Sequence, residues 1–219
     1  MKPAEKGNHM KKTQVPAMTE VSSADEAGGI ALAPTARQIA RLCTLIQKDC
    51  FVKIESGCSM RNALCEQFGI TPEYVKSEIK VFFLDNSPVD DIDAAIVRDG
   101  STMALSAAMP GLVGASMRQG GLSWMRSGIT YQEDGEVQGK RMGVIQLKLF
   151  NQVMADLGEA FLRRGVYVKT GVLAAFFARF SEEFWSECGN ITKNSESVTG
   201  STLMDYLKSS DEWVKFSIR

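Results

Sequence analysis

The sequence predicts an α+β fold, because short alternating strands and amphipathic helices follow one another and no internal repeat is found. Residues 50–55 (CFVKIE) alternate like a half-buried strand, and residues 79–84 (IKVFFL) form a strongly apolar one. Between them, Ser59 can cap a short helix over SMRNALCEQFG. Asp99-Gly100 supplies a tight turn before a last strand at Ser101–Leu105.

The composition excludes several classes of protein. Of the 219 residues, 44% are apolar and 23% charged, and the formal net charge of −1 gives no overall attraction to nucleic acid or to an anionic membrane. No run approaches the roughly 18 to 20 apolar residues of a membrane span. The basic start, MKPAEKGNHMKKTQ, is not followed by an apolar run of signal-peptide length. We therefore expect a cytoplasmic protein that binds neither nucleic acid nor membrane.

Three parts of the chain differ in pattern. Residues 1–34 are rich in Lys, Ser, Ala, Gly and Pro, and this composition predicts a disordered tail. Residues 35–121 are predicted to form a first folded domain, which begins with a helix whose capping box is Thr35 and Gln38. Residues 122–219 are predicted to form a second, small α+β region.

The second region has its own sequence of elements. Residues 128–132 and 142–147 could pair as a hairpin, and Phe150–Phe161 has the spacing of a helical face. Val172–Phe184 forms a second, very apolar helical face, and Trp213–Ile218 reads as a final strand. We interpret the Phe-rich stripe as core, with a homodimer interface as the alternative.

The string VFFLDNSPVDDIDAAIVRDGSTMALSAAMPG, residues 81–111, resembles the latter half of the bacterial sulfur carriers, the small subunit of molybdopterin synthase and the thiamine sulfur carrier. The strand 81–84 and the turn 85–89 match, and residues 107–111 match the small-residue tail. The aspartate-glycine motif is matched by Ile96, Asp99, Gly100, Thr102, Met103 and Leu105. The resemblance covers about residues 49–114. It implies a ubiquitin-like β-grasp fold for the first domain and a protein partner such as an adenylating or sulfur-transfer enzyme.

Two features depart from that family. A helix stands where the first β-grasp strand is expected, so this strand would have to lie near residues 28–33 or come from a later segment such as residues 128–132. The carriers also act through a free carboxyl-terminal Gly-Gly, whereas here the chain continues past Pro110-Gly111. A carbonyl in a peptide bond cannot be adenylated, so the chain as written is not a working sulfur carrier.

The candidate site residues follow from the resemblance. The family's mode of docking implies a partner-docking tail at Ala107, Ala108, Met109, Pro110 and Gly111. Gly120-Gly121 is a candidate processing site, with a flexible interdomain glycine pair as the alternative reading.

Other residues predict no chemistry of their own. The five cysteines have no C-x-x-C spacing and there is one histidine, so we expect no metal site and no catalytic cysteine. We interpret Asp90, Asp91 and Asp93 as an exposed acidic turn. No catalytic residue and no cofactor is predicted.

Three hypotheses for the function remain open from the sequence. The first is a non-enzymatic protein-interaction module built on a sulfur-carrier-like domain. The second is the precursor of a sulfur carrier or modifier, cleaved after Gly111 or Gly121. The third is an enzyme whose site lies in the C-terminal half.

Overall fold

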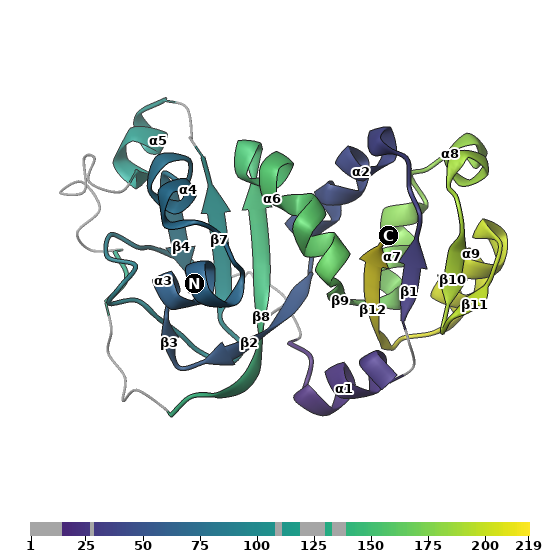
Figure 1. Cartoon of the computed structure of the whole chain (residues 1–219), viewed down its shortest axis with the longest axis horizontal. Helices are drawn as coiled ribbons and strands as arrows, with labels where there is room; N and C mark the ends of the chain where they lie inside the picture. The colour runs from purple at the N-terminus through teal and green to yellow at the C-terminus, as the bar shows by residue number, and fades with distance from the viewer. Residues whose placement is uncertain (1–14, 27–28, 108–110, 119–129, 133–138) are drawn as a thin grey trace, which may run out of the picture.

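The computed structural model of the protein describes residues 15–26, 29–107, 111–118, 130–132 and 139–219. It has an α+β fold, in which helices pack on one large mixed sheet (Figure 1). The ten strands of this sheet are β1 Ile30–Leu32, β2 Phe51–Ser56, β4 Val81–Leu84, β5 Ser87–Pro88, β7 Thr102–Ser106, β8 Arg141–Phe150, β9 Val166–Lys169, β10 Ile191–Lys193, β11 Glu196–Ser197 and β12 Trp213–Ile218. A separate ladder pairs β3 Cys58–Ser59 with β6 Ile96–Val97.

Helices occupy most of the connections between strands. In chain order they are α1 Met18–Glu26, α2 Ala36–Cys43, the 3-10 turn η1 Thr44–Gln47, α3 Met60–Asn62, the π-helical turn η2 Ala63–Gln67, α4 Pro72–Ser77, α5 Gly111–Met117, α6 Asn151–Arg164, α7 Thr170–Phe177, α8 Glu182–Glu187 and α9 Gly200–Ser209. Among the described residues, no helix is long and apolar enough to cross a membrane.

The pattern of parallel and antiparallel pairing in the large sheet is the same when it is read from either edge. The order is β11-β10-β1-β12-β9-β2-β8-β7-β4-β5, and β9 and β2 meet antiparallel at its middle. On each side of this junction the second and third strands, β12 with β1 and β8 with β7, are parallel, and the remaining neighbours are antiparallel. The chain therefore contains a first half-sheet, β2-β8-β7-β4-β5, and a second half-sheet, β9-β12-β1-β10-β11, which lie side by side in Figure 1.

The outer hairpins of the two half-sheets have the same turn geometry. The central residues of the β4–β5 turn, Asp85 and Asn86, have φ of 50° and 68°. Those of the β10–β11 turn, Asn194 and Ser195, have φ of 51° and 70°. Positive φ at both central residues is typical of the type I′ turn, whose twist matches that of paired strands. The repeat is thus structural, although the sequence shows no repeat.

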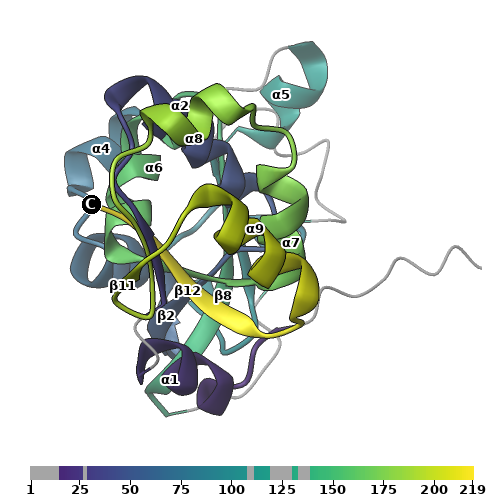
Figure 2. The same ribbon diagram turned by 90° about the vertical axis from the view of Figure 1, so that its right-hand side faces the viewer.

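The two faces of the sheet are covered unequally. One face carries a continuous core to which both half-sheets and the helices α2, α3, α4, α6, α7, α8 and α9 contribute buried side chains. Along β2, Val52 and Ile54 point into this core, whereas Phe51 points to the other face. On that other face a second, small cluster lies beneath α1. Its buried residues are Val21, Ala24, Phe51, Val144, Tyr167 and Trp213. Figure 2 shows α1 at the opposite end of the molecule from α2 and α8.

Helix α6 connects the half-sheets and packs closely on α2. Its buried Gly158 permits this approach, because an added Cβ would lie 2.8 Å from the Cys43 sulfur. The helix ends at Gly165, whose φ of 92° is a conformation that favours glycine. This confirms the helix predicted from Phe150–Phe161.

Several predicted boundaries differ from the structure. Residues 1–34 were predicted to be a tail, but α1 lies within this range and β1 (Ile30–Leu32) is an internal strand of the second half-sheet. Three buried apolar residues are enough for such a strand when neighbours cover both of its edges. The predicted boundary at residue 121 does not separate two sheets, because β8 from the second region lies between β2 and β7.

The same strand corrects the predicted hairpin. Residues 142–147 belong to β8, which pairs with β2 and β7, and residues 130–132 form no strand. Residues 128–129 and 133–136 lie outside the described residues. Near residues 28–33, β1 is a strand, but it pairs with β10 and β12 and not with β2. Residues 130–132 form no strand. Neither segment is therefore the first strand that the resemblance expects.

The very apolar pattern at Val172–Phe184 forms two helices, because α7 ends at Phe177 and α8 begins at Glu182. Phe176, Phe177 and Phe184 are buried, which agrees with the interpretation of the stripe as core.

Candidate functional site: the junction between the half-sheets

The expected docking tail lies in the connection between β7 and β8. Ala107 is partly buried against the main core at the end of β7. Gly111 is exposed, has φ of 76° and begins α5. Ala108, Met109 and Pro110 lie outside the described residues, as does the candidate processing site at Gly120-Gly121. The described part of this segment therefore leads into a helix and on to another strand of the sheet.

A wedge opens where β2 and β9 separate. The two strands share the register pair Phe51 and Tyr167, and two residues further along the ladder Lys53 would lie opposite Gly165. The Gly165 N–H instead donates to two carbonyls in the last turn of α6, at 3.0 and 3.2 Å. The last turn of α6 thus binds the N–H that would have continued the ladder between β2 and β9. The two strands therefore separate at this point.

The open edge of β2 faces this wedge. The Cys50 carbonyl accepts from the Leu147 N–H of β8, so in the alternation of the strand Lys53 and Glu55 direct their backbone groups away from β8. The side chain of Gln67 forms hydrogen bonds with both backbone groups of Glu55. Its Oε1 accepts from the Glu55 N–H at 2.8 Å, and its Nε2 donates to the Glu55 carbonyl at 3.0 Å. The backbone N–H and carbonyl of Lys53 have no such partner among the described residues.

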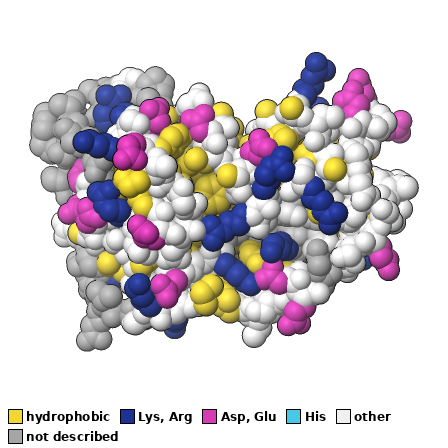
Figure 3. Space-filling view, viewed as in Figure 1, with side chains coloured by type: hydrophobic (Ala, Val, Ile, Leu, Met, Phe, Trp, Pro, Cys, Tyr) yellow, Lys and Arg dark blue, Asp and Glu magenta, His cyan; other side chains and the backbone are white. Residues whose placement is uncertain are grey.

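A cavity of about 400 Å³ occupies the wedge. Its lining combines β2, β9 and β12 with the ends of η2 and α6 and with α1. The lining residues are Asp25, Val52, Lys53, Ile54, Glu55, Gln67, Met142, Arg164, Gly165, Tyr167 and Lys215. Figure 3 shows Lys and Arg side chains gathered near the middle of the molecule, where Figure 1 draws β2 and the end of α6.

Asp25 of α1 bridges the two half-sheets. Its carboxylate forms ion pairs with Lys53 of the first half-sheet and, at 3.0 Å, with Lys215 of the second. The Tyr167 hydroxyl donates to the same carboxylate at 2.8 Å. Burial by itself would raise the pKa of Asp25, but the hydrogen bonds from Lys53, Lys215 and Tyr167 outweigh this effect and lower it. The carboxylate is therefore ionised at neutral pH, and it occupies a site that three donors form.

The remaining charges of the wedge favour an anion. Arg164 donates to the Gln67 carbonyl at 2.7 Å, and its guanidinium lies 5.5 Å from the centre of the Phe68 ring. Glu55 is paired on its outer side with Lys140 at 3.4 Å. Lys53, Arg164 and Lys215 thus exceed Asp25 and Glu55 by one positive charge among the lining residues. Arginine and lysine side chains at the rim of a partly enclosed cavity are suited to carboxylate recognition.

The small cluster under α1 lies beside the wedge on the same face. Phe51 and Trp213 meet edge to face, with ring centres 5.3 Å apart. Trp213 is 6% exposed, and its indole N–H is a buried donor with no hydrogen-bond partner among the described residues. Met142, a lining residue of the wedge, is 55% exposed, unusually high for a large apolar side chain. We call Phe51, Met142, Val144, Tyr167 and Trp213, together with Lys53 and Lys215, the junction face.

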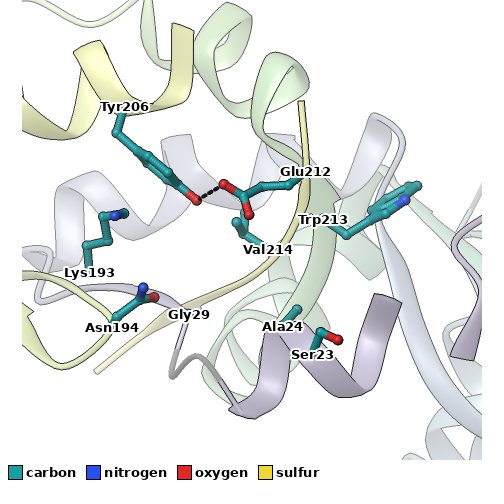
Figure 4. Close-up of a pocket in the computed structure, with 9 residues that line it drawn as sticks. All are labelled: Ser23, Ala24, Gly29, Lys193, Asn194, Tyr206, Glu212, Trp213 and Val214. Atoms are coloured by element: carbon teal, nitrogen blue, oxygen red, sulfur yellow. Dashed lines mark hydrogen bonds between the residues drawn. The ribbon is translucent and has the colours of Figure 1, made fainter. Parts of the chain in front are cut away.

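A second cavity, of about 420 Å³, lies on the other side of α1 (Figure 4). The Tyr206 hydroxyl donates to Glu212 at 2.8 Å, and the Lys193 ammonium lies 4.0 Å from the Tyr206 ring centre. Burial and the hydrogen bond to Glu212 raise the pKa of Tyr206 to about 12. The phenol is therefore a hydrogen-bond donor at neutral pH rather than a base. Ser23 and Ala24 of α1 line this cavity and Asp25 lines the first, so α1 contributes to the lining of both cavities.

The thiols are poorly suited to nucleophilic chemistry. Burial raises the pKa of every cysteine, to about 11 for Cys43 and further for the fully enclosed Cys50. Thiolates are therefore rare at neutral pH. Within the described residues, no three His, Cys, Asp or Glu side chains are placed to hold a metal ion.

Sequence reasoning did not find the junction face. Its polar residues, Lys53, Tyr167 and Lys215, come from three separate strands, and these strands read only as half-buried patterns in the sequence. Asp25 lies in a segment whose composition predicted a tail. The one available signal was Lys53 between the apolar residues Val52 and Ile54, which marks a strand face that is not fully buried.

Comparisons with known proteins identify no relative. No protein-family model matches the chain, and searches of the curated proteins and of the solved structures return no match.

Proposed function

We propose that the chain is a non-enzymatic, cytoplasmic protein-interaction module, and that its first half-sheet is a β-grasp of the sulfur-carrier type. The strand order β2-β8-β7-β4-β5 supports this proposal. The resemblance requires a first strand paired with the strand that precedes the helix, and β8 has this position, antiparallel to β2 and parallel to β7. The expected first strand would thus come from a later part of the chain, as in a circular permutation.

The position of β8 also weighs against the precursor hypothesis. In a sulfur carrier the segment after the last strand ends freely. Here the segment after β7 connects to β8, and cleavage after Gly111 or Gly121 would separate the chain into one piece with β2 and β7 and another with the strand between them. The intact mass of the endogenous protein tests this alternative. A species that ends at Gly111 or Gly121, especially a thiocarboxylate, would make the carrier hypothesis the better one.

The junction face is the surface that we propose for docking. It combines buried aromatic side chains, a rim of Lys53 and Lys215, and the exposed Met142, and such a mixture is typical of the centre of protein interfaces. Among the described residues, the helix that packs on this cluster is α1, whereas many helices cover the opposite face of the sheet. The observation that best supports the proposed function is this separate apolar cluster, with Lys53 and Lys215 at its rim.

Site-specific photo-crosslinking in the native cell tests the function. A photoreactive residue at Met142 should give an adduct of defined mass, and the same probe at the exposed Lys208 of α9 should not. The Met142 adduct should disappear when Lys53 and Lys215 are both changed to Glu. Equal labelling at both positions, or labelling that survives the charge reversal, would contradict docking at the junction face. An adduct of twice the mass of the chain would instead identify a homodimer.

A further inference from the structure

We infer that α1 occupies, within its own chain, a docking site for an acidic amphipathic helix of a partner protein. This inference rests on the proposed function for the existence of a partner and adds the chemical class of that partner. In the structure α1 lies across the junction face and places Asp25 between the cations of the two half-sheets. An external helix of the same character would compete with α1 for these contacts.

Few apolar contacts attach α1 to the junction face. The helix has nine residues, and helices of this length are marginal without support from packing. Its buried side chains are Val21 and Ala24, both small, and Met18 is only partly buried. A segment anchored by so few apolar contacts opens at a far lower free energy than the sheet to which it is attached.

The site is larger than its present occupant. Cavities of about 400 and 420 Å³ flank α1, one toward Lys53 and Lys215 and the other toward Tyr206 (Figure 4). The buried indole N–H of Trp213, which lies under α1, has no acceptor among the described residues. A helix with longer side chains could fill the cavities, and a suitably placed carbonyl or hydroxyl could accept from Trp213. A partner helix can therefore make contacts that α1 does not make.

The contacts of α1 define the chemistry of the competing helix. Val21 and Ala24 are three residues apart and share one helical face, and the carboxylate of Asp25 follows directly. This carboxylate meets Lys53, Lys215 and the Tyr167 hydroxyl, and a cation at the same position would meet two like charges. The expected partner helix has apolar residues at this spacing, followed by Asp or Glu.

The test uses the full chain and a labelled synthetic peptide that covers residues 15–26. The peptide should bind the wild-type chain weakly, because α1 competes for the same site. Asp25→Lys in the full chain should displace α1 by repulsion from the two lysines and increase the apparent affinity for the peptide by about tenfold or more. A control peptide with Lys in place of its aspartate should bind neither chain. Lys53→Glu combined with Lys215→Glu should abolish binding of the acidic peptide.

Equal affinity of the wild-type and Asp25→Lys chains for the peptide, or binding that persists after the double charge reversal, would overturn the inference. If Asp25→Lys does not fold, hydrogen exchange on the wild-type chain decides. The α1 amides should exchange at least a hundredfold faster than those of β2, and excess peptide should accelerate them further. Exchange of α1 only together with β2 would show a fixed element and overturn the inference, as would dimers that form by exchange of α1 between two chains.

The inference and the proposed function can fail separately. If the peptide competes with α1 but no protein is cross-linked at Met142, the site exists and the proposed function fails. If a protein is cross-linked at Met142 but its binding is unchanged by Asp25→Lys, the proposed function stands and the role of α1 is wrong.

Discussion

Phe51 and Tyr167 form the register pair that joins β2 to β9, and through it the two half-sheets become one sheet. Both side chains lie on the face that α1 covers, and the completely buried Phe51 meets Trp213 in a T-shaped ring contact. The junction therefore depends on side-chain packing and on the contacts of α1 more than on a long ladder of backbone hydrogen bonds.

Phe51→Ala should lower the free energy of unfolding by about 3 to 5 kcal/mol, because it removes a fully buried aromatic ring from the junction. Urea denaturation followed by tryptophan fluorescence measures the effect. Tyr167→Phe is the control: it keeps the ring and loses only the hydrogen bond to Asp25, and should cost about 1 kcal/mol. Similar losses for the two variants would show that packing does not hold the junction.

The two adjacent phenylalanines of β4 should differ clearly. Phe82 is 1% exposed and belongs to the main core, whereas Phe83 is half-buried on the other face. Phe82→Ala should therefore cost about 3 to 5 kcal/mol and Phe83→Ala distinctly less. Along β4, Phe82 and Leu84 point into the main core, and Val81 and Phe83 point to the other face. Chemical denaturation of both variants in parallel would reveal a reversed order.

Two helical glycines test the packing of α6 on α2. Gly158→Ala should destabilise the protein by about 1 to 3 kcal/mol, because its Cβ would lie 2.8 Å from the Cys43 sulfur. Gly171→Ala in α7 meets nothing within 4 Å and should be neutral or stabilising by up to about 1 kcal/mol. Helix propensity favours alanine at both positions, so the difference in melting temperature isolates the contact. Equal shifts would mean that α6 and α2 are not in close contact.

The contribution of Asp25 should depend on pH. Its pKa is lowered in the folded protein, so its stabilising effect is present above its ordinary value of 3.8 and is lost as the pH falls through the lowered value. The groups that face the Asp25 carboxylate are Lys53, Lys215 and Tyr167, and Glu55 also lines the wedge.

The variant Asp25→Asn checks this effect. At pH 7 it should be about 1 to 2 kcal/mol less stable than the wild type, toward the low end because the lysine side chains remain about a third exposed. At pH 3 or below the difference should shrink toward zero. Urea titrations of both proteins at several pH values give the measurement, and a difference that is constant with pH would exclude the Asp25 network as its source.

A chain that ends at Gly111 or Gly121 should not fold. Such a chain lacks β8, which pairs with β2 along six residues and with β7 along five, and leaves the edges of both strands open. We expect loss of near-ultraviolet circular dichroism and binding of a hydrophobic dye, compared with the full chain. A compact, cooperatively unfolding fragment would show that the fold does not require β8. The hypothesis of a processed sulfur carrier would then be the better one.

Local patterns predicted the local parts of the fold well. The interaction between Thr35 and Gln38 is present, with the Thr35 N–H donating to Gln38 Oε1 at 2.9 Å, and α6 and β12 lie close to their predicted ranges. The register of β4 was not predictable from alternation, because Val81 on its other face is also buried. An apolar strand with both faces covered offers no polar residue to mark the outer side.

The non-local parts could not be read from the sequence. The pairing of β8 with β2 and β7 depends on strands far away in the chain, and no local pattern selects a partner. The wedge exists because the Gly165 N–H ends a helix instead of extending a ladder, which is a competition between two hydrogen-bond partners that only the assembled structure shows. The candidate docking tail was derived from a family in which this segment has a free end, and its role stays a prediction.

The placement of β1 determines when the second half-sheet can form during synthesis. Ile30 of β1 pairs with Phe216 of β12. Because β1 is translated early, it has no β12 to pair with until almost the whole described chain has been translated. Until then β12 is missing, and the apolar residues of β1 and of its later neighbour β10 have no complete sheet to enter. Contacts between such distant segments slow folding and leave apolar strands exposed in the nascent chain. A cell that makes this protein is therefore expected to need a chaperone that binds extended apolar segments, at least until translation ends.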